Sequence, residues 1–269
     1  NTVRDNAAFR VAVEACLPKL SQFHSEVGQN LKLYEGYRKI TNSPDFGDLS
    51  SARKKVVKNA LRDFRLSGAE LEGDARERFR EIVSELSTLC NRFDQNLLDA
   101  TDHWCLDILE ENDLQGLPQS AIDLALKTAE DASLPGWRFS LQAPSYIPFM
   151  MFCENRTLRE TMYEAYVTRA SDTGPDAGKF DNGFLMVQIL ALRAEMASLL
   201  GFADYAQYAL EDRMADSAQE VGEFLQTLAG RAKEAATEEL DTLRRFALTE
   251  RGEQNLEAWD IAFYSEKLK

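Results

Sequence analysis

Histidine is scarce in this sequence, and the spaced motifs of the common hydrolases are missing from it. Only His24 and His103 occur among the 269 residues, and there is no HExxH, CxxC or GxSxG. A hydrolytic zinc ion usually has three protein ligands, often including two histidines one helical turn apart. We therefore assign no catalytic, cofactor-binding or metal-binding residue, and we expect no zinc to bind to this chain. A metal site made of both histidines and a carboxylate is the alternative that the sequence leaves open.

Basic residues are also few for a protein that would bind phosphates. The 31 lysines and arginines are outnumbered by 45 acidic residues, so the net charge is −14. Nucleic-acid binding needs clusters of basic residues, so nucleic acid is not expected as a partner. No apolar run reaches the roughly 18 residues that a membrane-spanning helix needs. The first residues lack the apolar core of a signal peptide, and we expect a cytoplasmic protein that does not contact the membrane.

The cysteines do not form a recognisable motif. Cys16, Cys90, Cys105 and Cys153 are scattered along the chain. Such spacing is typical of reduced, mostly buried thiols in a reducing compartment rather than of a disulfide framework or a metal site.

Apolar residues recur every three or four positions through most of the chain, which predicts a mainly α fold. The first helices predicted in this way cover about residues 6–27, 50–65 and 79–97, and turn-forming residues at 42–49 and 66–74 separate them. Tyr34 and Tyr37 would extend the first helix. Phe79, Leu86 and Phe93 belong to the most regular stripe and are expected in the core. Since each helix has one apolar face, we expect an antiparallel helical bundle.

A different pattern appears in the middle of the chain. Alternation of apolar and polar residues predicts one short extended or edge-strand element near 137–142. Pro144 and Pro148 exclude a long central strand, so an edge strand or an extended crossover is favoured there. Further helices are predicted at about 118–132, 155–170, 184–201 and 217–252, and the last of these begins with the capping box SAQE.

Three other patterns resemble functional motifs but have ordinary structural explanations. They are the glycine-containing segment 171–183, the acidic pair Glu238–Glu239, and the tyrosine pairs at 163/166 and 205/208. The segment lacks the spacing of a phosphate-binding loop and is interpreted as a solvated loop. The acidic pair lies among basic residues on a helix and is interpreted as exposed charge. The tyrosines have the i, i+3 spacing of core-facing positions, with a binding groove as the alternative.

Several stretches together resemble one family of peptidases. They are NALRDFRLSGAEL (59–71), FDQNLLDAT (93–101), APSYIPFMMFCENRTLRETMYEAYVTRASD (143–172), ILALRAEMASLLGFADYAQYAL (189–210) and AWDIAFYSEKLK (258–269). In this order they are similar to the thimet-oligopeptidase and oligopeptidase A family of zinc metallopeptidases, particularly its bacterial oligopeptidase A branch. The resemblance covers essentially the whole chain. One departure is Phe263, where relatives often have tyrosine.

The resemblance implies a neurolysin-like, two-lobed helical protein with a channel that admits short peptides and excludes folded proteins. The parent enzyme would hydrolyse internal bonds of short peptides with a zinc ion held by HExxH and a downstream glutamate. None of those residues has a counterpart in this chain. We therefore expect the chain to be the N-terminal helical lobe, to form part of the channel wall, and to be inactive alone.

The predicted organisation is a helical bundle subdomain at 1–135, followed at 136–269 by a short strand and helices that lead toward an absent catalytic part. Because the chain starts at Asn1 and stops after an aromatic-rich segment, we expect it to be an excised piece. Trp259, Phe263 and Tyr264 would contact the catalytic lobe in the intact enzyme. Here they would fold back, stay partly exposed or cause artificial self-association. The alternative is a stand-alone, non-catalytic helical module that binds peptides or proteins.

Overall fold

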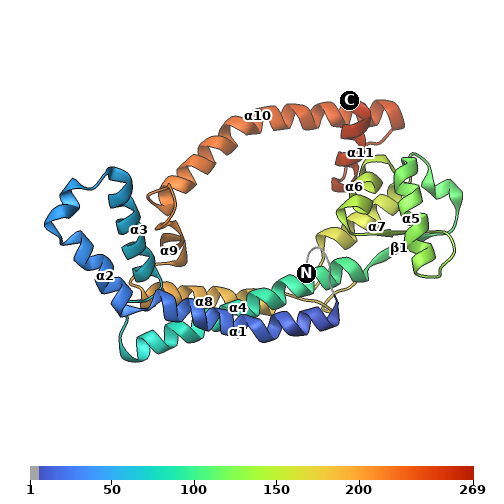
Figure 1. Cartoon of the computed structure of the whole chain (residues 1–269). Helices are drawn as coiled ribbons and strands as arrows, with labels where there is room; N and C mark the ends of the chain where they lie inside the picture. Colours follow the sequence, from blue (N-terminus) through green and yellow to red (C-terminus); the bar gives the residue numbers. More distant parts are fainter. Residues whose placement is uncertain (1–5) are drawn as a thin grey trace. The chain divides into compact units, whose positions relative to one another are not determined.

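The structure is a computed structural model that describes residues 6–269, and most of it is helical (Figure 1). The α-helices are α1 Ala7–Gly28, α2 Leu31–Thr41, α3 Ser51–Leu66, α4 Gly73–His103, α5 Gln119–Asp131, α6 Ala143–Phe152, α7 Arg156–Val167, α8 Gly183–Leu199, α9 Tyr205–Leu210, α10 Ala218–Arg251 and α11 Ala258–Leu268. The short 3₁₀ helices η1 Pro44–Asp48 and η2 Glu111–Leu114 and the strands β1 Cys105–Ile108 and β2 Trp137–Ser140 complete the regular elements of this range. The predicted mainly α fold is confirmed. Within residues 6–269, no helix is both long and apolar enough to cross a membrane.

The chain forms two compact units. The first contains the residues up to 92 together with 185–221, and the second contains 93–184 together with 222–269. These boundaries differ from the division at 135/136 that the sequence suggests. The division into subdomains 1–135 and 136–269 stays a prediction.

In the first unit, α2 and α3 form a helical hairpin, and α4 packs along α8 (Figure 1). The rings of Tyr34 and Tyr37 lie 6.0 and 5.8 Å from that of Phe64 across the hairpin. Between α4 and α8 the core consists of Phe79, Ile82, Leu192 and Met196, with Leu86 and Leu89 packed against it. Phe79 is therefore a core residue as predicted. Leu86 and Phe93 are only partly buried.

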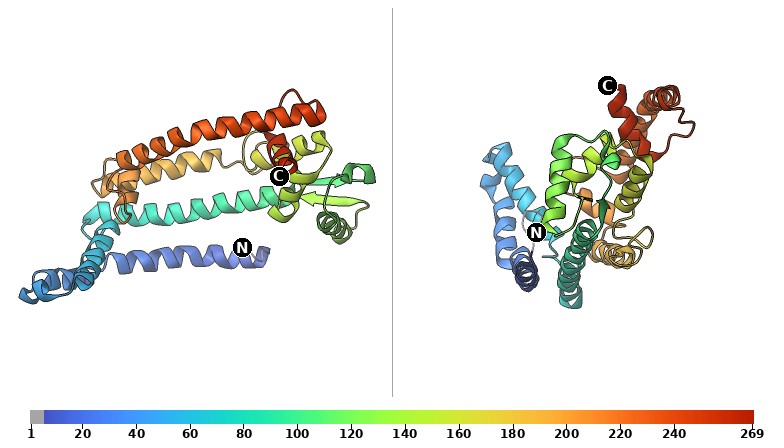
Figure 2. Two further views of the ribbon diagram at one scale, coloured as in Figure 1. Left: turned by 90° about the horizontal axis from the view of Figure 1, so that it is seen from above. Right: turned by 90° about the vertical axis from the view of Figure 1, so that its right-hand side faces the viewer.

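The first predicted helix ends earlier and packs differently than expected. Asn30 accepts a hydrogen bond from the Leu33 backbone N–H at 3.2 Å and starts α2, so the tyrosines at 34 and 37 belong to a separate helix. α1 runs beside α4 in both views of Figure 2 and faces it across a polar groove that includes Ser21 and Ser25. No residue of α1, all of which the structure describes, is buried. An apolar stripe thus predicts a helix without identifying the helix it will contact.

The second unit contains a small antiparallel sheet. β1 pairs with β2 in the register Cys105–Ser140 through Ile108–Trp137, which confirms the extended element near 137–142 and adds a partner that the sequence did not reveal. The ring of Phe139 lies 4.8 Å from that of Phe149 in an edge-on contact. Around this pair, the core of α5, α6, α7 and the sheet consists of Ile108, Leu114, Leu117, Ala125, Phe139, Leu141, Phe149, Met150, Cys153, Met162 and Ala165.

The segment after β2 is helical, which corrects the expectation of an extended crossover. Helix α6 covers Ala143–Phe152 and contains both prolines. Pro144 lies in the first turn, where its missing N–H would have had no partner in the helix. Pro148 lies inside the helix. Prolines therefore exclude a central strand here but not a short helix.

The long helix α10 begins at a cap that differs slightly from the predicted one. Ser217 Oγ accepts a hydrogen bond from the Glu220 N–H at 3.1 Å, as a capping box requires. The Glu220 carboxylate accepts from the backbone N–H of Asp216 at 2.7 Å, one residue before the expected donor. At its other end α10 packs against α11 through Leu243, Ala247, Phe263 and Tyr264.

Candidate functional site

The two histidines do not take part in a metal site in the described residues. His24 is exposed on α1, with its ring 5.7 Å from that of Phe23. His103 ends α4, where its Nε2 lies 2.6 Å from Lys179 Nζ and 3.5 Å from Asp176 Oδ1. No group of three or more histidine, cysteine or acidic residues within 6–269 is arranged to hold a metal ion. Residues 6–269 therefore offer no zinc site, and the expectation that the chain binds no zinc awaits a binding measurement.

The segment 171–183 forms internal contacts rather than a phosphate-binding loop. Asn182 is buried and binds Asn96 Nδ2 through its Oδ1 at 2.9 Å and the Phe93 carbonyl through its Nδ2 at 3.1 Å. At Gly174, φ is +84°, and a side chain there would collide with Thr168. These contacts attach the loop to the C-terminal part of α4.

The tyrosine pairs face the interior. Tyr163 packs on Trp259, and Tyr166 is stacked on Tyr146 with ring centroids 3.8 Å apart. Burial raises the pKa of Tyr146 to about 12, so this phenol stays neutral at physiological pH. Tyr205 and Tyr208 pack against the core of α4 and α8. All four are packing residues, whereas Glu238 and Glu239 are exposed on α10.

The thiols are free, as predicted from their spacing. Cys153 is buried, and burial raises its pKa to about 11, so it is not a reactive thiolate. Cys90 and Cys105 are partly buried, and Cys16 is exposed on α1, which differs from the expectation of mostly buried cysteines.

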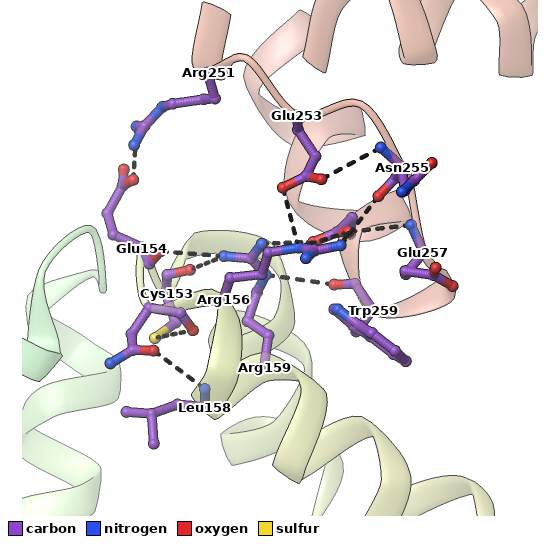
Figure 3. A network of polar contacts seen from close by, with 12 residues as sticks. Cys153, Glu154, Arg156, Leu158, Arg159, Arg251, Glu253, Asn255, Glu257 and Trp259 are labelled. Atoms are coloured by element: carbon purple, nitrogen blue, oxygen red, sulfur yellow. Dashed lines mark hydrogen bonds and ion pairs between the residues drawn. The ribbon is translucent and has the colours of Figure 1, made fainter. Parts of the chain in front are cut away.

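A network of buried charge connects α7 to the start of α11 (Figure 3). The Arg156 Nη2 and Arg159 Nη2 atoms lie 2.7 and 2.8 Å from the two oxygens of Asp260. The side chains of Arg159 and Asp260 are almost completely buried, and Arg159 also donates to the Cys153 carbonyl at 2.7 Å. Asp260 accepts a further hydrogen bond from the Glu257 N–H at 3.1 Å, which caps the N-terminus of α11. A buried ion pair of this kind is favourable only because its remaining donors and acceptors are also satisfied.

The environment keeps Asp260 ionised. Burial by itself would raise the pKa of Asp260, but hydrogen bonds from Arg156 and Arg159 and from the backbone of Glu257 outweigh it and hold the pKa below its usual range. The guanidinium of Arg159 also lies 4.0 Å above the ring of Phe263. The network therefore fixes both the position and the orientation of α11.

A second set of charges joins α11 to neighbouring segments at the surface. Glu154 accepts from Lys267 Nζ at 2.7 Å and lies 2.6 Å from Arg251 Nη2. Burial would raise the pKa of Glu154, but these two cations lower it below its usual value. Because Lys267 lies near the end of α11, the helix is held at both ends.

The aromatic residues near the end of the chain fold back on these helices. Phe263 and Tyr264 are buried against α10, and the partly buried Trp259 of α11 packs on Tyr163 of α7. Of the outcomes considered from the sequence, folding back is the one that the structure adopts.

In contrast, the N-terminal half of α10 exposes an apolar face to solvent, which is called the bare apolar face below. Its apolar residues continue in helical spacing from Val221 to Ala247. From 223 to 239 every residue is exposed, including Phe224 at 65% and Leu228 at 54%. The bare part continues into a groove of about 750 Å³ between α10 and α11. Its lining includes Ala235, Ala236, Leu240, Leu243, Ile261 and Leu268.

Helix α8 also has an exposed apolar face. Phe184, Val187 and Leu190 are 71, 65 and 64% exposed, although the opposite face of the helix lies in the core against α4. A helix that is apolar on all sides is normally covered on all sides. Several large apolar side chains exposed next to one another are typical of interaction surfaces.

Comparisons with known proteins give the class of this fold. The model of "Peptidase family M3" matches residues 149–269. The model of "Neurolysin/Thimet oligopeptidase, N-terminal domain" matches residues 1–76. The match to the N-terminal domain precedes the match to the peptidase family along the chain.

Individual relatives agree with the family models. Oligopeptidase A of Haemophilus influenzae is 48% identical over 269 residues, which is all of this chain and 40% of the relative. Oligopeptidase A of Escherichia coli is 46% identical over the same lengths. Probable cytosolic oligopeptidase A of Arabidopsis thaliana is 36% identical over 99% of the chain and 38% of the relative. The chain thus belongs to peptidase family M3, in the thimet-oligopeptidase and oligopeptidase A family. It spans about 40% of the length of the bacterial relatives.

Proposed function

We propose that the chain is the N-terminal helical part of a zinc-dependent oligopeptidase that hydrolyses internal bonds of short peptides. In that enzyme it forms part of the wall that restricts access to the reaction centre, and alone it is inactive. The observation that carries the proposal is the 48% identity to an oligopeptidase A along the whole chain. The match at residues 1–76 to a family N-terminal domain supports the assignment to the N-terminal part.

The zinc ion of the proposed enzyme would be held outside this chain. Within residues 6–269 no suitable group of ligands occurs, and the sequence has no HExxH. We therefore propose that this chain forms part of the channel wall and that the catalytic residues lie elsewhere in the enzyme. A metal-activated water does not itself distinguish short peptides from long ones, so selection by size requires walls around the centre.

The bare apolar faces of α8 and α10 support the existence of a large additional contact. We propose that the part of the enzyme that the relatives have beyond the matched region packs against these faces. Burying an apolar side chain of the size of leucine or phenylalanine contributes about 1.5–3 kcal/mol. Without that contact, the same faces would favour self-association of the chain. The proposed location of the enzyme is the cytoplasm.

Peptide hydrolysis by two proteins tests the proposal. One is the present chain, and the other is the product of the complete reading frame; both are given a short quenched-fluorescent peptide and, separately, a long unfolded polypeptide. The complete protein should cleave the short peptide, lose activity with a chelator and recover it with zinc, and leave the long polypeptide intact. The chain alone should cleave neither.

Two results would contradict the proposal. Cleavage by the purified chain would show that it contains a reaction centre. A reading frame that stops after Lys269, together with no hydrolysis, would instead favour the stand-alone binding module.

A further inference from the structure

The charge of the α2–α3 hairpin is opposite to that of the rest of the chain. Residues 31–66 contain nine basic and four acidic residues, a net charge of +5 in a chain whose total is −14. All of the excess lies on α3, which has six basic residues and one acidic residue. Lys55, Lys58, Arg62 and Arg65 follow one another at spacings of three, four and three, so they share one face of the helix.

This basic face, defined as Lys55, Lys58, Arg62 and Arg65, is only partly neutralised. Arg62 pairs with the adjacent Asp63 at 2.7 Å, and Arg65 pairs with Glu211 at 2.9 Å. Lys55 and Lys58 are exposed, and neither has an ion pair with any residue in the described range 6–269. Two free positive charges therefore lie beside two others on the same surface.

Such an arrangement has a cost for the helix. Like charges three or four residues apart destabilise a helix by about 0.2–0.5 kcal/mol per pair. The first turn of α3 contains no acidic residue, although acidic side chains are favoured there by the helix dipole. The opposite face of α3, with Val57 and Phe64, packs on α2, so folding of the hairpin does not require the basic face. A binding partner with negative charge would offset the cost.

We propose that the basic face of α3 binds an acidic segment of polypeptide, an interaction that goes beyond the proposed peptidase function. From position 55 to position 65 the face is about 15 Å long, at 1.5 Å per residue. An extended peptide advances about 3.3 Å per residue, so roughly five residues cover the face. Charge complementarity between the two surfaces would give the association its specificity and its speed.

Other anionic partners fit the surface less well. Single-stranded nucleic acid would need aromatic platforms for its bases, and the rings of Tyr34, Tyr37 and Phe64 pack on one another instead. An anionic membrane would require an apolar face on the same helix as the basic one. On α3, Val56 is the single exposed large apolar residue, and the exposed Leu31, Leu33 and Ile40 belong to α2. An acidic polypeptide requires neither feature.

Fluorescence anisotropy of a labelled pentaglutamate peptide measures the interaction with the full chain. Pentaglutamate should bind at low salt and weaken progressively as sodium chloride rises from about 50 to 200 mM. Pentaglutamine, which has no charge, should not bind. The double variant Lys55→Gln with Lys58→Gln should bind roughly fivefold more weakly, since exposed ion pairs contribute about 0.2–1 kcal/mol each.

Matched variants separate the basic face from general charge. Lys127→Gln with Lys233→Gln removes the same charge from exposed positions on α5 and α10 and should leave binding unchanged. Lys55→Arg with Lys58→Arg keeps the charge and should retain binding. Because Lys55 and Lys58 are exposed, the circular dichroism of all the variants should match that of the original chain, and no variant should melt earlier. The variant with glutamine at both positions should melt slightly later, because repulsion between like charges on α3 is relieved.

Three outcomes would overturn the proposal. One is no binding of pentaglutamate at low salt, and another is equal weakening in the two glutamine variants. The third is tighter binding of a single-stranded oligonucleotide of equal charge, or of anionic vesicles, than of pentaglutamate. In that case the surface would have a different partner. None of these outcomes affects the peptide-hydrolysis test, so the two proposals can fail separately.

Discussion

The two halves of α10 have the same apolar spacing but very different surroundings. In the C-terminal half, Leu243 and Ala247 are buried beneath α11, which the Asp260 network holds in place. In the N-terminal half, Phe224, Leu225 and Leu228 occupy equivalent positions and are more than half exposed. The difference lies in the partner and not in the helix. It shows that an apolar face is a property of the sequence, whereas its burial depends on another segment being present.

Removing the charge of Asp260 should have the largest effect. Asp260→Asn leaves the buried guanidinium of Arg159 without a counter-ion, and breaking a buried pair in this way costs about 3–5 kcal/mol. Urea unfolding followed by tryptophan fluorescence and by circular dichroism measures the loss. The exposed pair of Asp241 and Arg244 on α10 supplies the control, because Asp241→Asn should cost less than about 1 kcal/mol. If both substitutions have the same small effect, the network does not hold α11 in place.

Truncating one leucine in each half of α10 compares the halves directly. Leu243→Ala should destabilise the chain by about 2–3 kcal/mol, at the lower end of the range for buried leucines because the adjacent groove allows the site to collapse. Leu228→Ala should change the unfolding free energy by no more than about 0.5 kcal/mol, since the side chain is exposed. Equal losses measured by urea unfolding would mean that the N-terminal half is covered in solution.

Acid should reduce the stability of the contact between α11 and the C-terminal half of α10, because it protonates Asp260. Its folded-state pKa is depressed, so its contribution to stability is complete above the unfolded value of about 3.9 and is lost as the pH falls through the folded value. The difference in unfolding free energy between the original chain and Asp260→Asn should therefore be constant near neutral pH and shrink below about pH 4. Paired urea titrations across this range measure it. A difference independent of pH would show that the charge of Asp260 is not what the network uses.

Polar substitutions in the bare half should affect association more than stability. Phe224→Ser with Leu228→Ser should reduce self-association of the chain, because the exposed apolar area decreases while no buried contact is lost. Static light scattering over a range of concentrations reports the change. Gln226→Ser with Thr227→Ser alters the same turn of the helix off the apolar face and should have no effect. Identical scattering from all these proteins would mean that this face does not mediate association.

The sequence predicted most helices because their apolar spacing is a local property. It also predicted the strand near 137–142, the loop at 171–183 and the location of Phe79 in the core. It failed where structure depends on distant partners. The pairing of β1 with β2, the solvent exposure of α1 and the helix α6 around two prolines are of this kind.

The Asp260 network shows the same limit at the level of single residues. Arg156 and Arg159 are three residues apart, so the sequence places them on neighbouring positions of α7. Their acceptor, Asp260, lies about a hundred residues later in the chain. No local pattern connects it to the two arginines, and only the fold brings the three side chains together. The cap that Asp260 forms with Glu257 was the one local signal that could have attracted attention.

The most direct test of whether the rest of the proposed enzyme packs on the bare apolar face is hydrogen–deuterium exchange at residues 223–239 of α10. The same peptides are followed by mass spectrometry in the present chain and in the product of the complete reading frame. A helix packed in a core exchanges far more slowly than one exposed to solvent. We predict rapid exchange in the present chain and strong protection of this segment in the complete protein, with residues 243–247 protected in both. Equal, rapid exchange of residues 223–239 in the two proteins would contradict the proposal that the rest of the enzyme packs on this face.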